Sequence, residues 1–147
     1  GATVSVLRPR EIAEIYELRI LIEGHLVEHA VSRLTDEALT ALETIAHELD
    51  GDPVLSERLD RRKEFDERLD EHAERPRTLA MAKQLMDSVG RYLLLIPADD
   101  LHPHEELLSY LRAHDAVCAR EWLVAHLSSV SRKLQLEVAQ AGNRSKT

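Results

Sequence analysis

The stretch from Leu55 to Ala73 constrains the fold most, because charges interrupt an otherwise helical apolar pattern. At helical spacing, the positions that would face inward are Leu55, Leu59, Arg62, Asp66, Leu69 and Ala73. The centre of this stripe holds an oppositely charged pair four residues apart. Buried charges are costly unless they are paired or used. Two interpretations follow: Arg62 and Asp66 line a polar cavity inside a helical bundle, or Phe65 faces inward and the charged pair lies in solvent.

The composition favours one helical domain. The 147 residues include only one Phe, one Trp and three Tyr, too few aromatic side chains for a typical sheet. The formal charge is −8, and no run of cations suits a nucleic-acid surface. A single cysteine, Cys118, excludes an internal disulfide. We find neither a signal peptide nor a membrane span, and we expect a soluble, cytoplasmic protein with no membrane partner.

The apolar periodicity predicts an all-α fold, an antiparallel bundle of six or seven helices with short connections. Thr35 and Asp115 are candidate N-caps, and Pro9, Pro76 and Pro103 suit first helical turns. Residues 1–8 are expected to form a linker, residues 9–140 the domain, and residues 141–147 a frayed tail. The predicted helices cover residues 9–34, 36–49, 54–73, 76–96, 103–114 and 116–140.

The first predicted helix carries a second interrupted stripe. Arg19 takes the place of an apolar residue between Ile15 and Ile22. Leu21 and Val27 are among further apolar positions that make this helix hydrophobic on more than one side. We therefore expect it to be central, or shared with a second subunit in a homodimer.

His104 and His126 each lie eleven residues from Asp115, where the last two helices turn. In an antiparallel hairpin, equal distance from the turn gives equal height, because both helices rise by about 1.5 Å per residue. The pair would suit half of a metal site or two donors to an anionic ligand. The alternative is two independent core histidines, each bonded to a backbone carbonyl.

Several segments in order resemble one known family. They are Tyr16–Glu23, with an Arg followed four residues later by Glu, then Ala30–Thr35, Phe65–Leu79, His104–Asp115 and Ala119–Leu127. Together they resemble the FCD domain, the ligand-sensing C-terminal domain of FadR-type regulators in the GntR family of transcription regulators. The resemblance covers residues 10 to about 138. It implies a FadR C-terminal-domain-like bundle, with a winged helix-turn-helix DNA-binding domain upstream.

The same resemblance implies a possible divalent metal site. Many members hold the ion through an Asp and a His one turn apart, with one His from each of two later helices. These positions correspond here to Arg62, Asp66, His104 and His126, so the first two ligands are replaced. Asp66, His104 and His126 could still hold zinc or nickel. The cation at Arg62 opposes this, and we favour a site without a cofactor in which Arg62 replaces the metal.

We therefore predict effector sensing and no enzymatic activity. A small anionic metabolite, expected to be a carboxylate, would bind at Arg19, Arg62, Asp66, His104 and His126. DNA would be bound only through the upstream domain. One alternative is a helical-bundle metalloenzyme with Asp66, His104 and His126 as ligands and Glu64 or Asp70 as base, although no Glu-x-x-His pairing supports it. Another is a purely structural dimerisation module.

Overall fold

The computed structural model describes residues 6–52, 54–96 and 105–144. These residues contain no strand, which confirms the predicted all-α fold. The elements are α1 (Pro9–Val31), α2 (Asp36–Gly51), α3 (Leu55–Glu71), α4 (Pro76–Val89), the 3₁₀ helix η1 (Gly90–Leu95), α5 (Glu105–Arg112) and α6 (Ala116–Arg144). None of these helices is both long and apolar enough to cross a membrane.

The helices begin where local chemistry favours a start. The Thr35 side chain accepts a hydrogen bond from the amide of Ala38 at 3.1 Å, and Asp115 accepts one from the amide of Cys118 at 3.0 Å. Pro9 and Pro76 are the first residues of α1 and α4, where a missing amide proton costs nothing. Both predicted caps are confirmed. The prediction for Pro103 lies outside the described residues.

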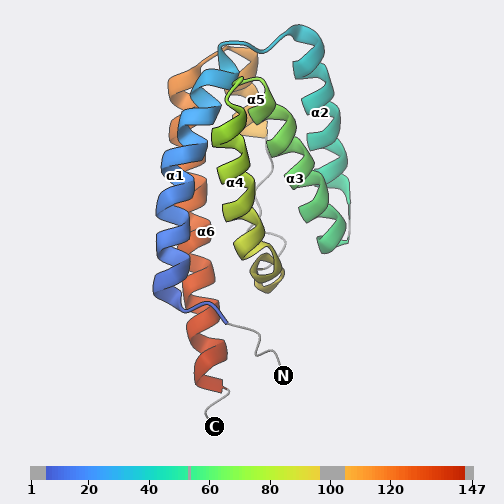
Figure 1. The fold of residues 1–147 in the computed structure, drawn as a ribbon. Helices are drawn as coiled ribbons and strands as arrows, with labels where there is room; N and C mark the ends of the chain where they lie inside the picture. Colours follow the sequence, from blue (N-terminus) through green and yellow to red (C-terminus); the bar gives the residue numbers. More distant parts are fainter. Residues whose placement is uncertain (1–5, 53, 97–104, 145–147) are drawn as a thin grey trace.

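The helices form an antiparallel bundle in which α1 and α6 lie side by side along one edge (Figure 1). α1 contacts α6 along its length and also contacts α4 and α3, whereas α2 packs on α3 and α5. The start of α1 and the end of α6 lie at the same end of the bundle. The chain covers only part of the broad apolar surface of α1, because Val27 and Val31 are buried while Leu18 and Leu21 are exposed.

The helix ends differ from the predictions by two or three residues in α1, α2 and α3, and by more in α4 and α6. The α-helical geometry of α4 stops at Val89 and continues as the tighter η1, where three residues rather than 3.6 complete a turn. The α-helical spacing predicted that Leu93 and Ile96 face inward. In the structure Tyr92 and Ile96 are buried, whereas Leu93 is only half-buried. At the C-terminus, α6 continues to Arg144, so the first four residues of the expected frayed tail are helical.

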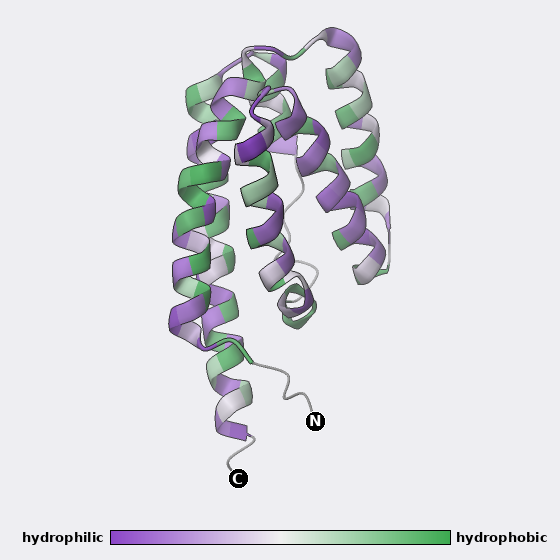
Figure 2. Ribbon diagram, viewed as in Figure 1, coloured by the Kyte–Doolittle hydropathy of each residue, from purple (hydrophilic) through white to green (hydrophobic). Residues whose placement is uncertain are grey.

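Two apolar clusters fill the bundle, one near each end. The first includes Leu26, Phe65 and Leu111, and the second includes Ile12, Val89 and Leu134. A polar layer lies between them, since Arg19 and Glu23 separate the two clusters along α1 and His126 separates them along α6. Figure 2 shows that α3 is hydrophilic over much of its length. The candidate site lies where α3 meets this layer.

Candidate functional site

A cavity of about 330 Å³ lies beside the polar layer, at the small end of the range for ligand pockets. Its wall is built by α1, α3, the end of α4, η1 and the middle of α6. Three predicted site residues, Arg19, Arg62 and Asp66, line it. Their side chains come from helices that the sequence separates by about forty residues, so the bundle assembles the site.

Arg19 is held by a buried ion pair. Its Nε donates to Glu23 Oε2 at 2.6 Å and its Nη2 donates to Glu23 Oε1 at 3.3 Å. The guanidinium also lies 4.8 Å from the centre of the Tyr16 ring. Burial disfavours the cation, but the Glu23 carboxylate, together with Tyr16 and Asp66, outweighs burial and raises the pKa of Arg19. Arg19 is therefore a charged wall residue whose guanidinium is already paired within the chain.

Arg62 is half-buried and reaches from α3 to α6. Its Nη2 makes a short contact with Nε2 of His126. Burial lowers the pKa of Arg62, and the Asp66 carboxylate opposes that change. The structure shows no direct ion pair between Arg62 and Asp66, so the proposed role of Asp66 in holding the guanidinium is not seen.

His126 does not line the cavity, but it connects the cavity to Trp122. The His126 side chain is buried behind Arg62 and stacks on the indole of Trp122, with ring centres 5.0 Å apart and planes 7° from parallel. This agrees with the expectation that the two residues, one helical turn apart, are neighbours. The residues Arg62, His126 and Trp122 therefore form a continuous path from the cavity wall to the only tryptophan of the chain.

Two acidic side chains of α3 lie on the same side of the layer. Burial raises the pKa of Asp66 to about 6, although Arg62 acts in the opposite direction. Asp70, one turn later, is buried, and burial raises the pKa of its carboxyl well above the ordinary value, with Asp66 and Glu23 adding to the effect. Both carboxyls therefore hold protons more tightly than exposed aspartates do.

The predicted inward stripe of α3 is confirmed in part, because Leu59, Arg62 and Asp66 line the cavity and Leu69 and Ala73 are buried, but it omitted Phe65. Phe65 is completely buried in the first apolar cluster, as the alternative interpretation proposed. That interpretation also placed Arg62 and Asp66 in solvent, but both are half-buried on the cavity wall. Phe65 therefore faces the core, and the charged pair lies on the adjoining face of the helix.

His104 lies outside the described residues. Its expected height opposite His126, and its part in the site, therefore stay predictions.

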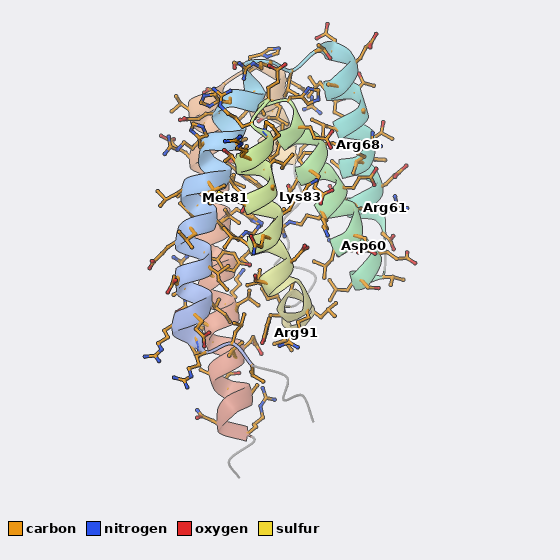
Figure 3. All side chains as sticks on the ribbon, viewed as in Figure 1. Asp60, Arg61, Arg68, Met81, Lys83 and Arg91 are labelled. Atoms are coloured by element: carbon orange, nitrogen blue, oxygen red, sulfur yellow. The ribbon has the colours of Figure 1, made fainter. Side chains whose placement is uncertain are left out.

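At the rim of the cavity, Lys63 of α3 donates a hydrogen bond to Asp87 of α4 at 3.2 Å. Figure 3 shows two further residues of the lining, Asp60 on the first half of α3 and Arg91 in η1.

Comparisons with known proteins agree with this architecture. Residues 14–129 match the family described as the FCD domain. The chain belongs to the FCD domain family. The match confirms the recognition of the C-terminal domain type of GntR-family regulators, and it indicates a regulatory, effector-sensing domain. Nothing in it supports the metalloenzyme alternative.

One solved structure similar to this FCD domain is E. coli McbR/YncC. The two chains share 24% sequence identity and align with a TM-score of 0.81 over 92% of this chain and 73% of the other. At this identity the likeness concerns the fold. No match was found among curated proteins.

The described residues of this FCD domain do not fit the metal site that the resemblance implies. A guanidinium, Arg62, stands at the position of one ligand and contacts Nε2 of His126, one of the two ring nitrogens through which this histidine could bind a metal. Within residues 6–52, 54–96 and 105–144, no three His, Cys, Asp or Glu side chains are grouped to hold a metal ion. The arrangement is instead suited to hydrogen bonding with an anion.

Sequence reasoning did not assign Tyr16, Glu23 or Asp70 to the effector site, and it named Asp70 only as a base in the metalloenzyme alternative. Tyr16 is buried on the cavity wall, and its hydroxyl has no hydrogen-bond partner among the described residues. Glu23 neutralises Arg19, and Asp70 extends the acidic side of α3. Helical spacing could have indicated them, because they lie three or four residues from Arg19 or Asp66.

Proposed function

We propose that this FCD domain senses a small carboxylate that binds in the cavity between α1, α3, α4 and α6. The observation that carries the proposal is the position of Arg62, a half-buried guanidinium on the cavity wall that forms no ion pair with another described residue. An arginine in such a place can hold a carboxylate through two parallel hydrogen bonds.

The proposed complex contains no metal cofactor. Arg62 supplies the positive charge that a metal ion supplies in many relatives, and His126 orients the guanidinium from behind. Tyr16 offers a hydroxyl donor to the ligand, since its own partner is missing from the described residues. His104 remains a candidate for a further donor, as the sequence predicts.

The proposed output is control of DNA binding by a winged helix-turn-helix domain that precedes these residues in the full-length protein. The domain would act as a homodimer. Leu18 and Leu21 on α1 are exposed in the single chain, and exposed apolar side chains of this kind suit an interface. The effector must favour one dimer geometry over another, because a ligand with equal affinity for both shifts neither population.

Trp122 provides a direct test of binding. Because its indole stacks on His126, which contacts Arg62, an effector that engages Arg62 should change the tryptophan fluorescence saturably. We would titrate the chain with monocarboxylates, dicarboxylates, tricarboxylates and hydroxy acids, and repeat the titration with Arg62→Ala. A saturable signal that is equal in both proteins would contradict the proposal.

A further inference from the structure

The cavity has two chemically different parts. Its polar part consists of Tyr16 and Arg19 from α1 and of Arg62 and Asp66 from α3. Its apolar part lies toward the second cluster, to which Leu93, Leu127 and Val130 belong, and Met86 adds a further apolar wall. A ligand that contacts both parts needs a polar head and a hydrocarbon body.

The charges of the polar part limit that head to a single negative charge. Arg19 is neutralised by Glu23, whereas Arg62, one turn before Asp66 on α3, forms no ion pair with another described residue. One carboxylate can therefore be paired with Arg62. A second carboxylate in the same place would be a buried charge without a partner, which is costly. The other cations of the lining, Lys63 and Arg91, lie at exposed positions, and Lys63 is already paired with Asp87.

The size of the cavity sets an upper limit on the ligand. A volume of about 330 Å³ accommodates a compact acid, whereas drug-sized ligands occupy pockets of up to about 1,000 Å³. A nucleotide-bearing thioester would have to leave most of its mass outside. An acid as short as acetate, in turn, would not reach the apolar wall.

We infer that the effector is an amphiphilic monocarboxylate, whose single carboxylate pairs with Arg62 and whose hydrocarbon body packs on Met86, Leu93, Leu127 and Val130. This inference rests on the proposed function, since it specifies the chemical class of the same effector. The inference distinguishes this class of effector from the di- and tricarboxylates that a strongly cationic site would bind.

Two matched series of acids test the inference by isothermal titration calorimetry. The monoacids are acetate, butyrate, hexanoate and octanoate, and the diacids are succinate, adipate and suberate. We expect the affinity for monoacids to rise by about fourfold for each added methylene until the cavity is filled. Each diacid is expected to bind at least tenfold more weakly than the monoacid of equal length.

Diacids that bind as tightly as matched monoacids, or monoacids whose affinity is independent of length, would overturn the inference. If Arg62→Ala still weakened the binding of those diacids, the proposed function would stand and the assigned class alone would be wrong. Saturable binding that Arg62→Ala leaves unchanged, or no saturable binding of either series at millimolar concentration, would count against both.

Two methionines of α4 give a matched pair of variants. Met86 lines the cavity and is 9% exposed, whereas Met81 is 56% exposed and lies away from it (Figure 3). Met86→Gln is expected to weaken the binding of octanoate at least fivefold while changing that of butyrate much less. Met81→Gln should change neither. Equal losses for both acids, or for both variants, would show that the hydrocarbon body does not contact this wall, and thermal unfolding of each variant checks that it is folded.

Discussion

Arg62 of α3 contacts Nε2 of His126 of α6, although 64 residues separate them in the sequence. The contact places a cation against a histidine that the family resemblance assigns to metal binding. It also links the cavity wall to the buried layer between the two apolar clusters, because His126 stacks on Trp122. Arg62, which stands at a metal-ligand position of the family, is therefore both the reason to expect no bound metal and the basis of the proposed anion site.

The first prediction concerns metal content. We expect the purified protein to carry little tightly bound zinc or nickel, because Arg62 opposes a cation beside it and contacts His126. Elemental analysis after extensive dialysis measures this. Near-stoichiometric metal that disappears in the His104→Ala/His126→Ala double variant would show that the histidines bind an ion after all.

The second prediction concerns the buried pair of Arg19 and Glu23, whose closest atoms are 2.6 Å apart. Glu23→Ala leaves a buried guanidinium without its partner and is expected to lower the free energy of unfolding by about 3–5 kcal/mol. The Arg19→Met/Glu23→Leu double variant removes both charges and should recover most of that loss. Urea unfolding measures both, and a double variant no more stable than Glu23→Ala would argue against the buried-charge explanation.

The third prediction follows from the raised pKa of Asp66. Because the pKa is about 6 in the folded protein against 3.8 for the ordinary group, the carboxyl favours folding below pH 3.8, and this contribution is lost as the pH rises through 6. The loss corresponds to about 3 kcal/mol at most. Asp66→Asn should therefore stabilise the protein more at pH 8 than at pH 4.

Asp70→Asn should act in the same direction, because burial also raises the pKa of Asp70. Asp60→Asn, an exposed substitution on the same helix, is the control and should have little effect. Thermal or urea unfolding across this pH range measures all three variants. If Asp66→Asn were equally stabilising at both pH values, titration of the carboxyl could not be the cause.

The fourth prediction concerns assembly. If α1 contributes to a homodimer, Leu21→Glu should place a charge in the interface and shift the protein toward monomer. Leu136→Glu on α6 is the matched control, because Leu136 is similarly exposed, at 63% against 64% for Leu21. Light scattering at micromolar concentration measures the mass. A monomeric wild-type chain would remove the basis for the prediction, and a dimeric Leu21→Glu variant would place the interface elsewhere.

The sequence predicted the bundle well because its signals are local. Helical periodicity, the Thr35 and Asp115 caps and the prolines at helix starts each act within one or two turns. The interrupted stripes of α1 and α3 also identified three residues of the cavity wall, Arg19, Arg62 and Asp66.

The features that the sequence did not predict depend on tertiary packing. The burial of Phe65 on α3 and the change to 3₁₀ geometry at Gly90 follow from how neighbouring helices fit together, which periodicity does not record. The pairing of Arg19 with Glu23 instead of with a ligand was visible as an i, i+4 spacing, but only burial shows its energetic weight.

The most direct test of the account compares the affinity of one identified carboxylate ligand for four proteins by calorimetry: wild type, Arg62→Ala, Arg62→Lys and Arg68→Ala. Arg68 lies on the same helix but is exposed, so it controls for loss of a positive charge (Figure 3). We predict that Arg62→Ala weakens binding about ten- to a hundredfold, the loss of a charge-assisted contact of about 1.5–3 kcal/mol. Arg62→Lys should recover part of the affinity and Arg68→Ala should retain all of it. Unchanged affinity in Arg62→Ala would contradict the account.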